Sequence, residues 1–236
     1  PKGKMVKVLF EPNAKLTDSL TYDITAWSLP YAHGFKAIAS TTKVSSRKDV
    51  MVDTANNEID KNAYAYVLKW NSLEDASFLA ALLQEDVRVR FSEKDFTIEG
   101  NSYAKGTLII LRGDNKTNKE FDKHITSIAQ NKNRKLTPVQ TGFVSSGKDF
   151  GSSSVHPINK QKVAVISGKG TSSLSFGEIW HFFETQLNYP LTALDTEYIN
   201  RVDLDTYDVL IIPNGYYSNV LNKDGLEKIN KFVLAG

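Results

Sequence analysis

Residues 63–91 read AYAYVLKWNSLEDASFLAALLQEDVRVRF, and this stretch decides the fold class. Its first eight residues are aromatic or aliphatic apart from Lys69, which is typical of a strand. Ser72, followed three residues later by Asp75, then predicts a capped helix. The apolar stripe of that helix is expected at Leu73, Ala76, Leu79, Ala80 and Leu83. Residues 87–91 alternate apolar side chains with arginines and indicate a half-buried strand. Strand, helix and strand in succession predict an α/β protein.

The pattern continues on the carboxyl side of this stretch. Residues 96–98 and 107–111 predict two further strands, and residues 120–132 predict a second helix. That helix is expected to bury Phe121, Ile125 and Ile128. We therefore expect residues 63–158 to form a small α/β domain with a mixed sheet, and residues 1–62 to connect it to an upstream domain. Residues 142–159 contain three glycines and a serine run, so they predict a linker or an ordered surface loop.

A second α/β pattern covers residues 159–236. Strands are predicted at residues 163–167, 191–194 and 209–213, with helices over residues 174–187 and from Asn222 or Asp224 onward. Short apolar strands between helices indicate a parallel sheet covered on both faces. Three strands are few for such a sheet, so this unit is either truncated or shares a sheet with the preceding one. Because the chain has no leading methionine and stops at what looks like the end of a helix rather than of a domain, we expect it to be a piece of a longer polypeptide.

Composition excludes several classes of function. The 236 residues carry a formal net charge of +2 and contain no cysteine, so there is no thiol nucleophile, thiolate metal site or disulfide. The basic residues do not form the stripe that is expected of a nucleic-acid-binding protein. The cluster at residues 132–135 (KNRK) is interpreted as a solvated helix end. No apolar run approaches the roughly 18 residues that a membrane-spanning helix needs. We therefore expect neither nucleic acid nor a membrane span.

Two turns are candidates for ligand binding. Residues 168–173 (GKGTSS) follow a predicted strand and open a helix, where backbone N–H groups favour an anion. The Rossmann and Walker patterns are both incomplete there, and a tight turn with a serine N-cap is the alternative. Residues 214–217 follow the strand at 209–213, and ligands gather at the carboxyl ends of parallel strands, although Asn-Gly is also a common turn. The candidate ligand-binding residues are Gly170, Ser172, Ser173, Asn214 and Tyr216.

No catalytic or metal-binding residue is predicted. His181 and Glu184 have the H-x-x-E spacing that can place two ligands on one metal ion, but no later histidine supplies a third. We interpret the pair as the polar side of a helix packed on the sheet. Asp203, Asp205 and Asp208 are interpreted as a solvated connection between strands. No serine lies in a G-x-S-x-G elbow, and no Ser/His/Asp set has a supporting context.

Four stretches of the chain carry a family resemblance. They are residues 20–32 (LTYDITAWSLPYA), 103–110 (YAKGTLII), 147–152 (GKDFGS) and 174–180 (LSFGEIW). Together they resemble the region after the peptidase domain in a subgroup of large bacterial zinc carboxypeptidases of the carboxypeptidase A-like superfamily. The stretches are long and distinctive, but they are not catalytic motifs.

The resemblance implies an upstream peptidase domain that binds zinc through H-x-x-E and a later histidine and uses a general-base glutamate. No residue of this chain matches those positions, so no catalytic residue is transferred. The resemblance also implies peptide substrates and a periplasmic or extracellular location. Residues 159–236 are similar to the first part of a flavodoxin-like, class I glutamine amidotransferase-like domain. Amidotransferase chemistry needs a cysteine, which this chain lacks.

Three hypotheses follow from the sequence. The leading one is a non-catalytic accessory C-terminal portion of a zinc metallocarboxypeptidase, which packs on or assists the upstream peptidase domain. The alternative is a module that binds a small anion or sugar between residues 168–173 and 214–217. A third hypothesis is an enzyme whose nucleophile lies beyond Gly236.

Overall fold

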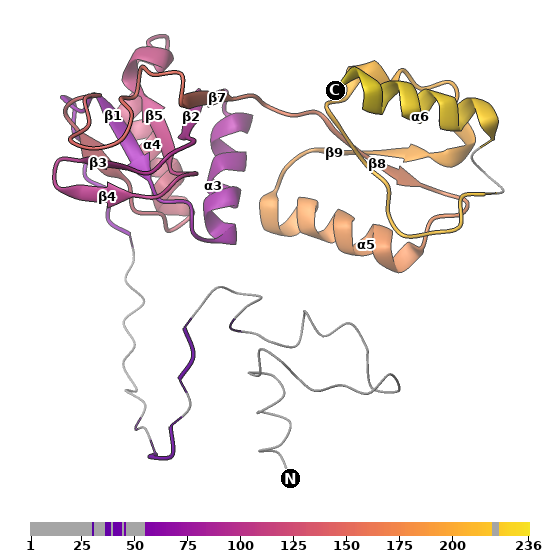
Figure 1. The fold of residues 1–236 in the computed structure, drawn as a ribbon, viewed down its shortest axis with the longest axis horizontal. Coiled ribbons are helices and arrows are strands. Elements are labelled where there is room, and N and C mark those ends of the chain that lie inside the picture. The colour runs from indigo at the N-terminus through magenta and orange to yellow at the C-terminus, as the bar shows by residue number, and fades with distance from the viewer. Residues whose placement is uncertain (1–29, 31–35, 39, 44, 46–54, 219–221) are drawn as a thin grey trace. The chain divides into compact units, whose positions relative to one another are not determined.

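The structure is a computed structural model that describes residues 30, 36–38, 40–43, 45, 55–218 and 222–236. Contacts divide the chain into residues 1–52 and 53–236. Most of the expected connecting segment, including nearly all of residues 20–32, lies outside the described residues. The described residues of the segment 53–236 form two separate sheets of three or more strands and a two-stranded hairpin (Figure 1), so the two α/β units do not share a sheet.

The first sheet has five strands in the order β6-β1-β5-β2-β7. The strands are β1 (Ala65–Leu68), β2 (Val89–Ser92), β5 (Leu108–Leu111), β6 (Thr137–Val139) and β7 (Val155–Ile158). The α/β class is confirmed, and each neighbouring pair is antiparallel where the sequence led us to expect a mixed sheet. The reason is the position of β5. Helix α3 (Leu73–Gln84) connects β1 to β2, which run in the same direction, but β5 lies between them and opposes both.

The same arrangement occurs a second time around β1. Helix α4 (Phe121–Asn131) connects β5 to β6, and β1 lies between these two strands. Two interlocked split β-α-β units give the connectivity of the ferredoxin-like motif, with β7 added at the edge beside β2. Strands β4, β6 and β7 were missed at the sequence level because they are short and poor in apolar alternation.

One face of this sheet packs on α3 and α4. Phe78 and Leu82 of α3 are fully buried there, together with Phe121 and Ile125 of α4. The predicted stripe on α3 is confirmed at Ala80, which is buried, and at Leu79, which packs against the core, but it is wrong at Leu73, which is 42% exposed, and it omitted Phe78 and Leu82. Residues 74–82 contain apolar side chains on more than one face, and burial of Phe78, the largest of them, decides which face meets the sheet. Ser72 and Asp75 form the predicted capping box.

The opposite face is covered by a hairpin and a loop. The hairpin consists of β3 (Phe96–Ile98) and β4 (Asn101–Tyr103), and the loop spans residues 140–154. Phe150 inserts from this loop, has no exposed surface, and meets Phe96 edge-on with ring centres 5.4 Å apart. Of the two alternatives for residues 142–159, the ordered surface loop is thus observed, and it leads into β7. Burial on both faces explains why β1 and β5 are buried along their whole length.

A buried polar network closes one end of the helix-covered face. The guanidinium of Arg112 donates to both carboxylate oxygens of Asp122, at 2.6 and 2.9 Å, and the hydroxyl of Tyr66 donates to Asp122 at 2.9 Å. Burial raises the pKa of Tyr66 to about 12, and the neighbouring carboxylate of Asp122 contributes to that rise. Burial alone would also raise the pKa of Asp122, but the hydrogen bonds from Arg112 and Tyr66 outweigh it and leave that pKa lowered.

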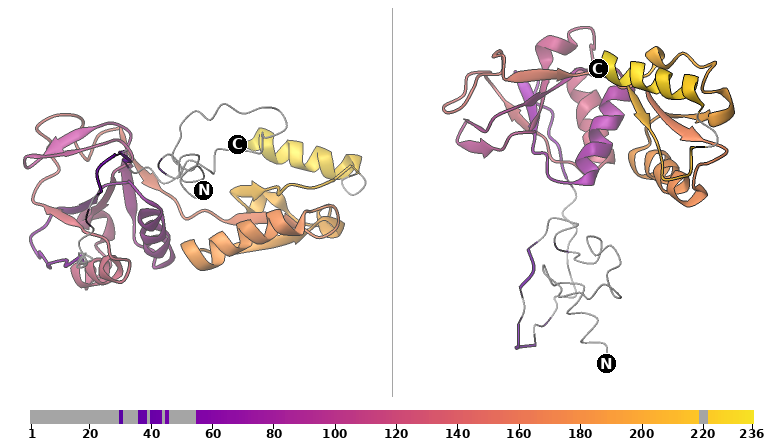
Figure 2. Two further views of the ribbon diagram at one scale, coloured as in Figure 1. Left: turned by 90° about the horizontal axis from the view of Figure 1, so that it is seen from below. Right: turned by 45° about the vertical axis from the view of Figure 1, so that its right-hand side comes forward.

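The second sheet is parallel, with the order β10-β8-β9. Its strands are β8 (Val163–Ser167), β9 (Leu191–Asp195) and β10 (Val209–Ile211), and its helices are α5 (Ser173–His181) and α6 (Lys223–Ala235). Figures 1 and 2 show α5 and α6 on opposite sides of the three strands, as the sequence predicted. Helix α5 continues as a π-helical segment, Phe182–Leu187. Among the described residues, no helix combines the length and the apolar character needed to cross a bilayer.

Candidate functional site

The two turns predicted from the sequence meet at the carboxyl ends of β8 and β10. The N–H of Ser172 donates to the carbonyl of Asn214 at 2.9 Å, and the N–H of Tyr216 donates to the carbonyl of Gly170 at 2.7 Å. A β-bridge between Thr171 and Gly215 lies between these bonds. They meet because β8 and β10 are adjacent parallel strands, whose ends share one edge of the sheet.

The hydrogen bonds of this pair of turns show how much donor capacity is left for a ligand. The hydroxyl of Ser172 accepts the N–H of Ser175 as the N-cap of α5. The N–H of Asn214 donates to the hydroxyl of Ser175 at 3.1 Å. Three backbone donors of the predicted site, on Ser172, Asn214 and Tyr216, are thus used within the protein. What the turns present outward is the side chains of Ser173, Asn214 and Tyr216, of which Tyr216 is 90% exposed.

Gly215 is the point of closest approach between the turns. A Cβ atom there would collide with the backbone carbonyl of Gly170. We expect Gly215→Ala to lower the free energy of unfolding by about 1–3 kcal/mol, because a rigid backbone atom must move. Urea unfolding checks this. Gly177→Ala is the matched control, since a Cβ there meets nothing within 4 Å and alanine favours the α5 helix. Equal stability of G215A and the unsubstituted chain would contradict the close approach.

The H-x-x-E pair lies where α5 passes into the π-helical segment, and its partners are local. The indole N–H of Trp180 donates to Glu184 at 2.9 Å, and the hydroxyl of Thr185 donates to the carbonyl of His181. His181 and Glu184 are both exposed. Within the part of the chain that the structure describes, no group of three or more histidine and carboxylate side chains could hold a metal ion.

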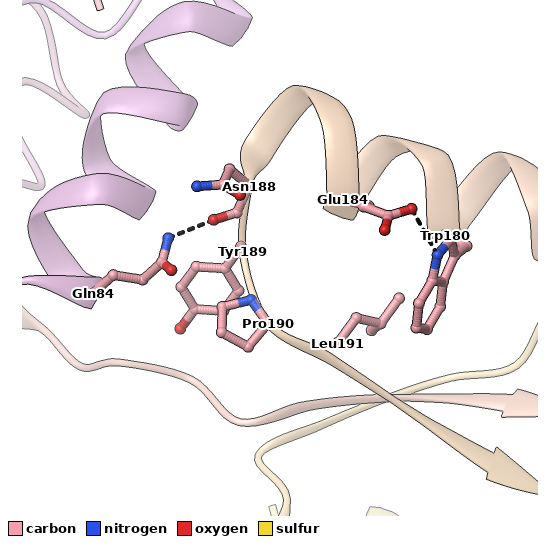
Figure 3. Close-up of a pocket in the computed structure, with 7 residues that line it drawn as sticks. All are labelled: Gln84, Trp180, Glu184, Asn188, Tyr189, Pro190 and Leu191. Carbon is pink, nitrogen blue, oxygen red and sulfur yellow. Dashed lines mark hydrogen bonds between the residues drawn. The ribbon is translucent and has the colours of Figure 1, made fainter. Parts of the chain in front are cut away.

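A small pocket lies beside this helix (Figure 3). Its volume is about 270 Å³, and its lining is Gln84, Trp180, Glu184, Asn188, Tyr189, Pro190 and Leu191. Asn188 ends the π-helical segment in the left-handed region, with φ 51°, and its carbonyl accepts a hydrogen bond from Gln84. This pocket was not predicted from the sequence, although the i, i+4 spacing of Trp180 and Glu184 could have indicated it. An indole, a carboxylate and amides around an apolar floor suit a small polar ligand.

Two of the three aspartates between β9 and β10 accept hydrogen bonds from backbone N–H groups. Asp203 accepts the N–H of Asp205 at 3.2 Å, as the N-cap of a short 3₁₀ helix, and Asp208 accepts the N–H of Lys162 at 2.6 Å. All three carboxylates belong to exposed residues. This arrangement agrees with a solvated connection between strands.

Comparison of the chain with models of known protein families, with curated proteins and with solved structures gives no match.

Proposed function

We propose that this chain is a non-catalytic accessory portion of a zinc metallocarboxypeptidase that packs on the peptidase domain of the same polypeptide. The observation that carries the proposal is the apolar surface of the second α/β unit. Large apolar side chains stand more than one-third exposed on α5, β10, α6 and the segment after β10. They are Leu174, Trp180, Val209, Ile212, Tyr216, Leu226, Val233 and Leu234. Leu226 and Val233 stand seven residues apart on α6 and therefore share one face of that helix. Exposed apolar side chains that gather on one face are typical of a protein contact.

The open edge of the parallel sheet supports the same proposal. Strand β10 has β8 on one side and no partner among the described residues on the other. Parallel sheets are normally buried on both faces and extended by further strands, so β10 is suited to contact additional structure. The order β9-β8-β10 corresponds to strands 2-1-3 of the flavodoxin-like order. This correspondence supports a partial amidotransferase-like unit at residues 159–236.

In this proposal the chemistry belongs to the upstream peptidase domain, in a periplasmic or extracellular protein. Zinc held there would activate water for removal of C-terminal residues from peptides. The residues of this chain would contribute packing and positioning, and the four resembling stretches support their assignment to that region.

An immunoblot of the source cells with an antibody against this chain tests the proposal. We expect a band much larger than 26.3 kDa, and chelator-sensitive carboxypeptidase activity in the immunoprecipitate. The isolated 236-residue chain should have no such activity. A native band at about the size of this chain, or chelator-sensitive turnover by the chain alone, would contradict the proposal.

A second candidate function is binding of a small anion or sugar at the paired turns. It is favoured by the contact of residues 168–173 with residues 214–217. Because Ser172 caps α5, its replacement would destabilise the helix whether or not a ligand binds. Asn214→Ala is the cleaner probe, since the observed bonds of Asn214 use its backbone. Ligand-dependent thermal shifts that N214A abolishes would support this candidate, and their absence from the unsubstituted chain would reject it.

A further inference from the structure

A pocket of about 410 Å³ lies in the first α/β unit, at the end of β1 where β1 pairs with β6. Three cationic side chains line it: Lys69, Arg134 and Lys135. The last two belong to the cluster that the sequence analysis interpreted as a solvated helix end. One carboxylate, Asp75, lines the same pocket.

The two lysines lie just beyond the paired strands, since β1 ends at Leu68 and β6 begins at Thr137. The last observed pair joins Val67 of β1 to Thr137 of β6. Lys69 and Lys135 each stand two residues beyond this pair, and both line the pocket. Like charges that share one pocket repel each other. Their placement therefore favours an anion that neutralises both.

The carboxylate of Asp75 is already satisfied by other groups. One of its oxygens accepts the N–H groups of Asn71 and Ser72, both at 2.8 Å, and the other accepts Nη1 of Arg134 at 3.1 Å. Its side chain is only 5% exposed. Asp75 thus neutralises the charge of Arg134. No carboxylate that lines the pocket remains to neutralise the two lysines.

The cations are positioned by their surroundings and keep unused donors. Nζ of Lys69 lies 5.5 Å from the centre of the Tyr103 ring, and Nζ of Lys135 donates to the carbonyl of Asn56. Nη2 of Arg134 has no hydrogen-bond partner among the described residues. Each ammonium has three donors, so at least one on each lysine remains for a ligand.

We propose that this pocket binds an oxyanion, either a carboxylate or a phosphate group. Lysine and arginine side chains recognise these groups through charge-assisted hydrogen bonds. The hydroxyl of Thr137, which also lines the pocket, adds a neutral donor. The proposal is independent of the accessory role, because it concerns only the first α/β unit.

Titration of the 236-residue chain, followed by thermal shift and amide NMR, tests the proposal. The probes are inorganic phosphate, N-acetylalanine as a carboxylate, and N-acetylalaninamide as a neutral control. We expect at least one of the two anions to raise Tm and to shift resonances around Lys69 and Lys135, and the neutral amide to do neither. The double variant K69Q/K135Q should bind at least about tenfold more weakly, because two charged donors are lost. Binding of phosphate would identify the ligand group as a phosphate, and binding of N-acetylalanine would identify it as a carboxylate.

The double variant K116Q/K119Q is the matched control, since it removes the same charge from exposed positions outside the pocket lining. It should bind as the unsubstituted chain does. Without an anion, the Tm of K69Q/K135Q should equal or exceed that of the unsubstituted chain, because repulsion is removed. The proposal is overturned if neither anion binds, if K69Q/K135Q binds as well as the unsubstituted chain, or if the two double variants weaken binding equally. A large fall in Tm of K69Q/K135Q without an anion would assign the lysines a structural role and also overturn it.

Discussion

Phe150→Ala is expected to lower the free energy of unfolding by about 3–5 kcal/mol, the usual cost of removing a fully buried phenylalanine ring. Phe150 has no exposed surface and packs edge-on against Phe96. It is also the side chain by which the loop at residues 140–154 covers the second face of the sheet. The cavity would open between this loop and the hairpin, where the backbone bonds of Thr97 to Ser145 and Ser146 hinder collapse.

Equilibrium unfolding in urea gives this free energy, and Phe143→Ala is the control. Phe143 lies in the same loop but is 79% exposed, so its loss should change stability by no more than about 0.5 kcal/mol. If F150A and F143A were equally stable, the loop would not be the cover of the sheet that the structure shows.

Asp122→Asn is expected to lower the free energy of unfolding by about 2–3 kcal/mol at neutral pH. Removing one partner of a buried ion pair leaves the other uncompensated, which costs about 3–5 kcal/mol when both are fully buried. The side chain of Asp122 is 14% exposed, but that of Arg112 is 35% exposed, so solvent screening reduces the effect. The hydroxyl of Tyr66 would keep an oxygen acceptor in the variant, which limits the loss further.

The pH dependence provides an independent test of the same network. The folded-state pKa of Asp122 lies below the ordinary value of 3.8, so its stabilisation is present above that value and is lost as pH falls through the folded-state pKa. The stability difference between D122N and the unsubstituted chain should therefore be constant near neutral pH and shrink below about pH 4. Asp86→Asn is the control, because the side chain of Asp86 is 85% exposed and its φ of 55° suits asparagine. A difference that persists unchanged in strong acid would contradict the role of the Asp122 charge.

Those features of the candidate site that depend on neighbouring residues could be predicted from the sequence. Strand β8 was located with its correct bounds, and Ser172 and Asn222 act as N-caps of α5 and α6, because capping depends on a few neighbouring residues. The meeting of residues 168–173 with residues 214–217 followed from the expectation that both turns end parallel strands. The hydrogen bonds that occupy the backbone N–H groups of these two turns could not be predicted from the sequence, because these bonds depend on the spacing of β8 and β10.

The pocket that contains Lys69 and Lys135 could not be predicted from local sequence patterns. Residues 132–135 are a short charged cluster after a helix, and nothing in their neighbourhood distinguishes them from a solvated end. Only the pairing of β6 with β1 brings Lys135 into one pocket with a lysine 66 positions earlier in the chain. Pairing between distant segments is set by the burial of whole faces, which local patterns do not encode.

The amino-acid sequence by itself determined the α/β class, the four helices α3 to α6 and the strands of the second unit, since these follow from periodicity and capping within a few residues. Only the tertiary structure decided that β5 lies between β1 and β2, that the two units have separate sheets, and that Phe78 rather than Leu73 faces the core. The physical reason is that strand order and the orientation of a helix minimise exposed apolar area over the whole unit, with contributions from segments far apart in the chain.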